Sequence, residues 1–152
     1  QVHMTNTSNQ PIEALEAENP IIVESDSLIP DSGGTGKYRG GLGIERVFGV
    51  LTDCVSFTGH GGRMRIPAWG QAGGGSGATG GFYMEYADGR REHLPSMCDR
   101  VVMNRGDRLI VRTPGGGGFG NPLERNLELI RRDLEDGKIT AAKAASDYGY
   151  KP

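Results

Sequence analysis

Glycine is the feature of this sequence that most restricts its fold. It supplies 26 of the 152 residues, about 17%, against a usual share of about 7%. The glycines gather in four segments, 33–43, 59–62, 70–81 and 115–120, without a strict G-X-Y repeat. Because apolar residues still form periodic runs between these segments, the sequence excludes collagen and simple disorder. Ordering so many glycines is entropically costly, so we expect extensive packing around them.

The glycine segments are typical of extended chains that pack closely side by side. Polyproline-II segments have no internal hydrogen bonds, and where several lie together only glycine fits at the crowded contacts. Three of the four segments have proline close by or within them. We therefore expect a bundle of glycine-rich polyproline-II-type segments beside a β body.

Strand signals dominate the sequence before residue 113. Asp88-Gly89 predicts a type I′ turn, and Leu51-Thr52-Asp53 is expected to join two strands as a hairpin. A short helix is expected over 11–19, and 59–81 is expected to be non-helical. The strand candidates are 20–30, 44–50, 54–59, a hairpin over 82–94, and two short strands within 99–113.

The apolar period becomes helical towards the carboxyl end. Gly137 is a natural terminator for a helix there, and Thr140 suits the cap of a last short helix. We predict one mainly β structural domain, with a β body over 1–122 and a helical tail over 123–152. The apolar stripe of the first tail helix consists of Leu123, Leu127, Ile130 and Leu134.

Two glycine motifs resemble nucleotide-binding loops only in part. TPGGGGFGNP (113–122) contains G-x-G-x-x-G, but the chain supplies no second parallel strand after the next helix, as a Rossmann turn needs. Asn121-Pro122 also separates the glycines from that helix. In SGGTGKY (32–38), Asp31 precedes the motif where a P-loop needs glycine, and Tyr38 replaces its magnesium-binding hydroxyl. The sequence disfavours a nucleotide site in either loop.

Charge and cysteine content narrow the class of protein. The 17 basic and 19 acidic residues are dispersed and give a net charge of -2, which disfavours nucleic acid and anionic membranes as partners. No apolar run approaches the roughly 18 residues of a membrane span. Cys54 and Cys98 are far apart and have no Cys/His cluster around them. We expect reduced thiols in a cytoplasmic protein.

The reactive side chains supply no confident catalytic, cofactor-binding or metal-ligating residue. His60 lies between glycines that permit close approach of a ligand, although a loop histidine bonded to nearby backbone is the simpler interpretation. Arg63 and Arg65 suit a carboxylate or phosphate, or the rim of a subunit interface. His3 and Asn6 lie in a polar stretch that suits either the edge of a site or a solvated lead-in. His3, Asn6, His60 and Arg63 are the candidate site-edge residues.

Five motifs together resemble the carboxyl-terminal region of the hydantoinase B/oxoprolinase family. The resemblance covers essentially the whole chain, and the glycine motifs with their flanks are its most specific part. It implies barrel-like β-sheets that run into short polyproline-type segments. The motifs are MTNTSNQPIEALE, PDSGGTGKYRGGLGIER, PAWGQAGG, TPGGGGFGNPLER and DGKITAAKAASDYG.

The resemblance implies a non-catalytic or accessory subunit of a hetero-oligomer. The implied partners are a hydantoinase A-type ATP-binding subunit and a large hydantoinase B-type subunit, as in acetophenone carboxylase-type complexes. Such complexes hydrolyse cyclic amides (hydantoins, 5-oxoproline, lactams) or carboxylate ketones. ATP and a divalent metal are then expected on the partners, with no cofactor on this chain. The alternative is an autonomous module that binds a small anion at the GGGGFG loop.

Overall fold

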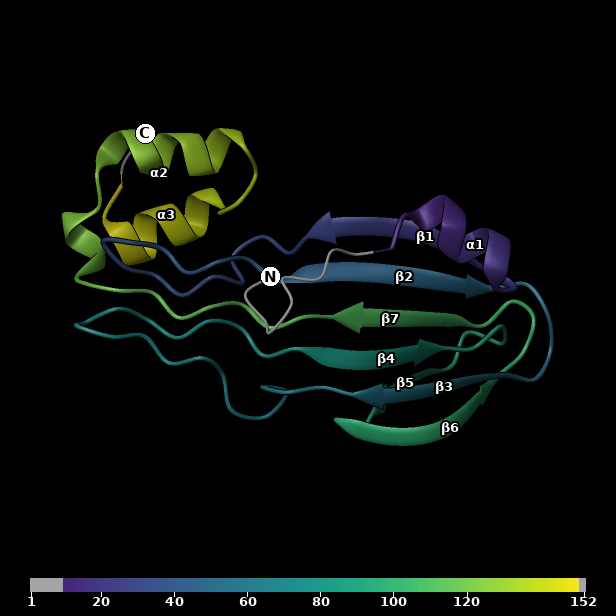
Figure 1. Cartoon of the computed structure of the whole chain (residues 1–152). Coiled ribbons are helices and arrows are strands. Elements are labelled where there is room, and N and C mark those ends of the chain that lie inside the picture. The colour runs from purple at the N-terminus through teal and green to yellow at the C-terminus, as the bar shows by residue number, and fades with distance from the viewer. Residues whose placement is uncertain (1–9, 151–152) are drawn as a thin grey trace.

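A five-stranded antiparallel sheet forms the centre of the computed structural model, which describes residues 10–150 (Figure 1). Its order is β1-β2-β7-β4-β5, and a separate two-stranded sheet pairs β3 with β6. The fold is mainly β, as the sequence predicts. The strands are β1 (Ile21–Leu28), β2 (Ile44–Val50), β3 (Val55–His60), β4 (Gly81–Glu85), β5 (Arg91–Leu94), β6 (Met97–Met103) and β7 (Arg108–Arg112).

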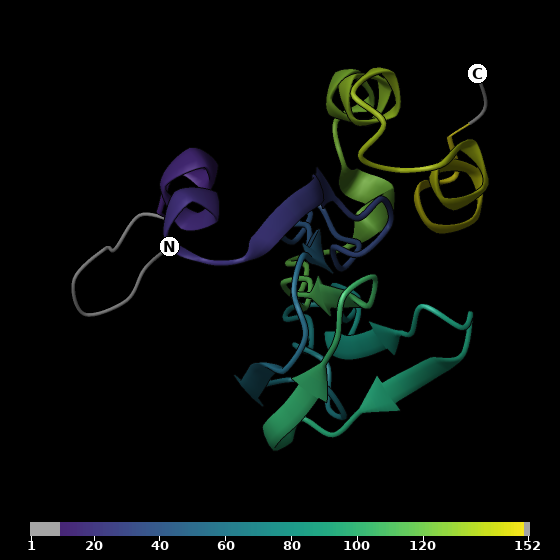
Figure 2. The same cartoon turned by 90° about the vertical axis from the view of Figure 1, so that its right-hand side faces the viewer.

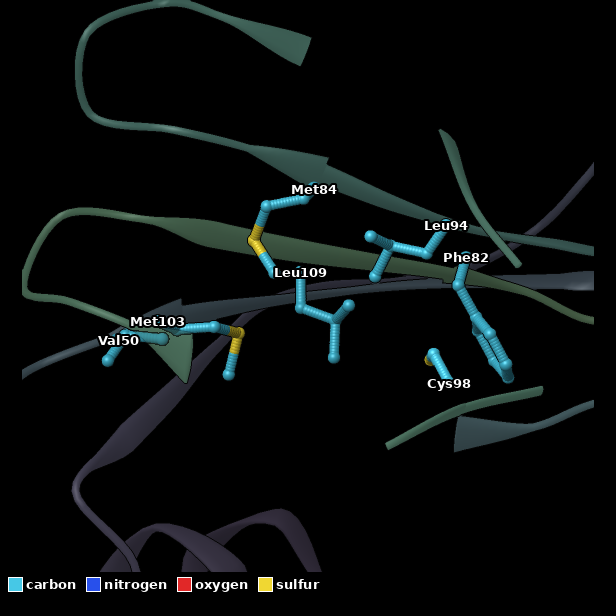
Figure 3. Close-up of a cluster of buried hydrophobic side chains, with 7 residues drawn as sticks. All are labelled: Val50, Phe82, Met84, Leu94, Cys98, Met103 and Leu109. Carbon is cyan, nitrogen blue, oxygen red and sulfur yellow. The ribbon is translucent and has the colours of Figure 1, made fainter. Parts of the chain in front are cut away.

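The main core lies between one face of the five-stranded sheet and the β3–β6 pair (Figure 3). Alternate residues of β4 and β7, such as Met84 and Leu109, point to this face because successive side chains of a strand face opposite ways. Phe57 of β3 meets Phe82 of β4 edge to face, with ring centres 5.3 Å apart. The buried members are Val50, Phe82, Met84, Leu94, Cys98, Met103 and Leu109.

The three central strands continue directly into three of the glycine segments. Segment 33–43 precedes β2, segment 70–80 precedes β4, and segment 113–120 follows β7. Because β2 and β4 both run antiparallel to β7, all three segments leave the sheet at the same end (Figure 1). We call residues 32–41, 68–78 and 115–120 the glycine layer.

Backbone contacts hold the glycine layer together. The N–H of Gly34 donates to the carbonyl of Gly116 at 2.8 Å, and that of Gly118 donates to Gly75 at 2.9 Å. A Cβ on Gly118 would lie 2.0 Å from the Thr35 carbonyl oxygen, closer than any side chain tolerates. The expected bundle therefore forms, and the polyproline-II conformation of its segments stays a prediction. Segment 59–62 lies outside the layer, since its glycines Gly59 and Gly61 pack against the side chains of Phe57, Phe82 and Met64.

The helices lie at two separate places around β1 (Figure 2). A short helix, α1 (Ile12–Glu18), packs beside β1, and a 3-10 turn, η1 (Pro122–Glu124), leads to α2 (Leu127–Glu135) and α3 (Ala141–Tyr148). As predicted, Thr140 caps α3 by accepting from the N–H of Lys143 at 3.2 Å, and Gly137 follows α2 with a φ of 65°. A second small core is formed by Ile130, Ile139, Ala144 and Tyr148.

The strands between residues 10 and 150 form no closed barrel, contrary to the barrel-like arrangement that the family resemblance implies. β1 and β5 are the two edges of an open sheet, and the β3–β6 pair joins neither edge. β5 has only four residues, and β1 exposes a polar run from Glu24 to Ser27. The sheet therefore ends at these two strands and does not close around the core.

The predicted hairpin of residues 44–59 is wrong, although both of its strands exist. β2 pairs with β1 and β7, whereas β3 pairs with β6. Residues 51–54, in which Cys54 has a φ of 60°, carry the chain from one sheet to the other. The apolar faces of β2 and β3 consequently contribute to the same core.

The hairpin predicted over 82–94 is confirmed, but its turn is not type I′. Gly89 has a φ of 86°, while Asp88 does not have the positive φ that type I′ requires. Tyr86 instead accepts from the N–H of Gly89 and donates to Arg90, both at 2.8 Å, around a three-residue loop. None of the helices of the described chain is long and apolar enough to cross a membrane.

Candidate functional site

The loop that follows β3 is fixed to the rest of the fold at several points. Gly61 donates to the carbonyl of Ser96 at 2.8 Å, and Gly80 donates to the carbonyl of Arg63 at 3.2 Å. The carbonyl oxygen of Trp69 packs so closely on Gly117 that a Cβ there would lie 2.1 Å away. The loop therefore holds its side chains on the rigid support of the glycine layer.

This loop surrounds a shallow hollow of about 400 Å³. Trp69 is 65% exposed and Ile66 is 66% exposed. The guanidinium carbon of Arg63 lies 5.4 Å from the centre of the Trp69 ring, and its Nη1 donates to the carbonyl of Pro67 at 3.2 Å. We call this site the Arg63–Trp69 hollow. It is lined by Arg63, Arg65, Ile66, Trp69 and Ser96.

The hollow carries positive charge that the described chain does not neutralise. Within residues 10–150, neither Arg63 nor Arg65 forms an ion pair. On the face of the sheet away from the main core, Arg108 pairs with Glu24 at 2.8 Å and Arg112 pairs with Glu45 at 2.6 Å. The hollow is thus suited to a group that brings its own carboxylates.

The structure brings together some of the predicted site residues and separates others. Arg63 and Arg65 share the hollow, whereas His60 is exposed at the end of β3, opposite Met97, and does not line it. His3 and Asn6 lie outside the described residues. Sequence reasoning missed Trp69, Ile66 and Ser96 as lining residues. The signal for Trp69 was present, since it is the only tryptophan and lies between two glycine segments.

A second polar cluster joins the helices to the glycine layer. Arg39 donates two hydrogen bonds to the carboxylate of Asp133, at 2.9 and 3.2 Å, and Arg125 donates a third at 2.7 Å. The three side chains are at most 14% exposed. Burial raises the pKa of Asp133, but the hydrogen bonds and charges of the two arginines outweigh it and hold the pKa below its ordinary value. Arg125 is therefore buried in this cluster and does not lie on a solvated helix face.

The same cluster contains two buried polar atoms without a hydrogen-bond partner in the described chain. They are Nε of Arg125 and the hydroxyl of Tyr148. The guanidinium carbon of Arg125 lies 5.8 Å from the centre of the Tyr148 ring. Burial, as the largest influence, raises the pKa of the Tyr148 phenol. The cluster lies between layer and helices, where it fixes their relative position.

The GGGGFG loop uses five of its six backbone N–H groups, all except that of Gly117, in hydrogen bonds within the described chain. Gly115 donates to Ala78, Gly116 to Gly41 and Gly118 to Gly75, at 2.9 to 3.0 Å. Phe119 and Gly120 likewise donate to carbonyls of the other two segments. These N–H groups are not free to cradle a phosphate, so the loop serves packing. In the described part of the chain, no group of three or more His, Cys, Asp or Glu side chains is placed to hold a metal ion.

The open antiparallel sheet, the glycine layer and its motifs define a class of protein. The chain belongs to the hydantoinase B/oxoprolinase family, whose sequence profile matches residues 1–122. It is 46% identical over 144 residues to an uncharacterized protein of Methanocaldococcus jannaschii, covering 94% of this chain and 25% of that protein. It is 32% identical over 142 residues to caprolactamase subunit beta of Pseudomonas jessenii, covering 91% and 24%.

Two solved structures share the fold. A nucleotide-free acetone carboxylase matches with a TM-score of 0.77 and 23% identity, over 92% of this chain and 23% of that chain. The ATP-dependent caprolactamase of Pseudomonas jessenii matches with a TM-score of 0.74 and 30% identity, over 91% and 24%. The chain therefore spans about a quarter of the length of these relatives.

Proposed function

We propose that this chain is an accessory element that completes the hydantoinase B-type body of an ATP-dependent cyclic-amide hydrolase or ketone carboxylase. The observation that carries the proposal is the apolar surface that the chain leaves exposed. The described residues expose about as many large apolar side chains as they bury. Exposed apolar side chains that lie together, as Tyr38 and Phe119 do, are typical of protein interfaces.

The exposed apolar side chains occur on several elements. Tyr38 and Phe119, in neighbouring segments of the glycine layer, have ring centres 6.4 Å apart and are 62% and 50% exposed. Met97 and Val102 are exposed on β6, at 70% and 56%. In a relative whose chain is about four times as long, additional polypeptide is available to cover such surfaces. Further exposed members are Ile22, Leu28, Leu51, Leu123, Leu127 and Leu129.

In the proposed complex, the partner polypeptides carry out the reaction. A hydantoinase A-type subunit would bind ATP, and a large hydantoinase B-type subunit would hold the divalent metal and the substrate. This chain would bind no nucleotide and would not catalyse alone. His60 and Arg63 stay proposals for the edge of the substrate chamber, and the cytoplasmic location stays a prediction. The alternative of an autonomous anion-binding module has little support, because the GGGGFG donors bond internally.

Reconstitution tests the proposal. The chain is co-expressed with the hydantoinase A-type and large hydantoinase B-type polypeptides of the same source, and the complex is isolated by size and native mass spectrometry. ATP-dependent opening of lactams, hydantoins and 5-oxoproline, and ATP-dependent carboxylation of ketones, are then measured with and without this chain. We expect a stable complex whose activity requires the chain. A chain that stays monomeric beside both polypeptides would refute the proposal.

A separate measurement tests the alternative, an autonomous module that binds a small anion. A ligand that binds only the folded state raises the melting temperature, because it stabilises by RT ln(1 + [L]/Kd). The chain alone is therefore melted with and without millimolar inorganic phosphate. A phosphate-dependent rise would favour the anion-binding module. An unchanged melting temperature would exclude it.

A further inference from the structure

The Arg63–Trp69 hollow has the composition of a protein-binding hot spot. Tryptophan and arginine are enriched among the residues that dominate binding energy, and they work best at the centre of a desolvated patch. Trp69 and Ile66 are each about two-thirds exposed in the described chain, and Arg63 lies over the Trp69 ring. Resting on the proposed function, we propose that this hollow docks an acidic, partly apolar segment of the large hydantoinase B-type polypeptide.

The hollow is preorganised for docking. A flexible loop loses part of its binding energy because it has to be ordered when the partner binds. Here, the backbone is already held at Gly61, Arg63 and Ala68 by hydrogen bonds, and at Trp69 by the contact with Gly117. The glycine layer thus holds the backbone at Trp69 in place before a partner binds, so docking requires little further ordering of the loop backbone.

The charge of the hollow selects an acidic partner. Arg63 and Arg65 lie together in one hollow and have no carboxylate partner within residues 10–150, whereas Arg108 and Arg112 of β7 are paired. A partner carboxylate would supply the missing charge, and charge complementarity would orient the approach. A small anion alone would leave Trp69 and Ile66 exposed, so the arrangement favours a polypeptide segment that also brings an apolar side chain.

The single tryptophan makes the test direct. The chain is produced with 5-fluorotryptophan, so its only fluorine resonance reports on position 69, and the unlabelled large hydantoinase B-type polypeptide of the same source is added. We expect the fluorine resonance to shift when the large polypeptide binds. A soluble gadolinium chelate, which enhances the relaxation of exposed nuclei, should then no longer affect it, because the bound polypeptide covers Trp69. The experiment is run at low micromolar concentration, with the unbound chain as reference.

Charge reversal supplies the second arm of the test. The double variant Arg63→Glu/Arg65→Glu should weaken binding of the large polypeptide at least about tenfold, and it should reduce the salt dependence of the remaining binding. Trp69→Ala should weaken binding about thirtyfold, the size of a hot-spot loss. Arg100→Glu/Arg105→Glu is the matched control, because both arginines are also exposed and form no ion pair in the described chain but lie outside the hollow. We expect it to bind as the wild type does.

The outcomes separate this inference from the proposed function. If the large polypeptide binds but leaves the fluorine resonance unchanged, or binds the double variant as tightly as the wild type, the hollow is not the docking site and the proposed function stands. If the large polypeptide does not bind at all, both fail. Circular dichroism of each variant verifies that the exposed substitutions leave the fold intact.

Discussion

Replacing Gly34 of the glycine layer by alanine should destabilise the fold far more than replacing Gly41, another glycine of the same segment. A Cβ on Gly34 would lie 2.2 Å from the carbonyl oxygen of Gly75 and 2.6 Å from the nitrogen of Gly118. Non-bonded atoms need roughly 3.5 Å, so the segments would have to separate by about 1 Å. Gly34 is buried, and no flexible side chain can move away to relieve the contact.

The magnitude follows from the hydrogen bonds at this contact. Separation would stretch the bonds from Gly34 to Gly116, 2.8 Å, and from Gly75 to Thr35, 2.7 Å. Each buried polar group left unsatisfied costs about 1–3 kcal/mol, so Gly34→Ala should lower the free energy of unfolding by about 2–6 kcal/mol. At about 2–4 °C per kcal/mol, the melting temperature should fall by roughly 10 °C.

Gly41→Ala is the control for this prediction. A Cβ on Gly41 would meet nothing within 4 Å, and its φ is not positive. Alanine there should stabilise by about 0.4–1 kcal/mol, because it restricts the unfolded chain. Urea unfolding followed by circular dichroism, at low micromolar concentration, measures both variants. Equal stability of Gly34→Ala and Gly41→Ala would show that the layer is not packed through its missing side chains.

Two further predictions concern the buried cluster between the glycine layer and the helices. Asp133→Asn should cost about 3–5 kcal/mol, since it leaves Arg39 and Arg125 buried without a counter-charge. The folded-state pKa of Asp133 lies below its ordinary value of 3.8, so its stabilising effect is complete above that pH and is lost as the pH falls through the folded-state pKa. Urea unfolding between about pH 2 and 7 should show a larger loss of stability in acid for the wild type than for Asp133→Asn, since the other carboxylates titrate in both; identical pH profiles would contradict the assignment. Tyr148→Phe should leave stability unchanged or raise it, because it removes an unpaired buried hydroxyl, and ultraviolet titration should show one fewer phenol with a raised pKa; a clear loss of stability would reveal a hydrogen bond at that hydroxyl.

Local signals predicted the elements of this fold well. The bounds of β2 coincide with the apolar run 44–50, and α3 begins directly after its cap, Thr140. Both features depend on interactions among a few neighbouring residues, so a single sequence is sufficient to predict them. The glycine-rich segments also predicted the glycine layer, because only glycine fits where extended chains pack closely side by side.

Strand pairing and the site were harder to predict because they depend on distant contacts. β2 and β3 are neighbours along the chain, yet they belong to different sheets, and only the packing of both strands against one core favours that arrangement. The contact of Arg39 with Asp133 spans 94 residues, and no local pattern indicates it. Leu123 and Leu127 follow a helical period but are exposed, at 69% and 66%. Their helical spacing predicted a buried stripe, but it gave no indication that these two side chains are exposed in the described chain.

The continuity between central strands and glycine segments has a consequence for the order of folding. The layer unites residues from three distant parts of the chain, and ordering glycine is entropically expensive, so it is expected to form after the sheet has brought β2, β4 and β7 together. Contacts that are absent from the transition state alter the unfolding rate and leave the folding rate nearly unchanged. Gly34→Ala should therefore accelerate unfolding in stopped-flow experiments while refolding keeps its speed. The glycine layer would then provide kinetic stability, because it slows the unfolding of a sheet that forms before it.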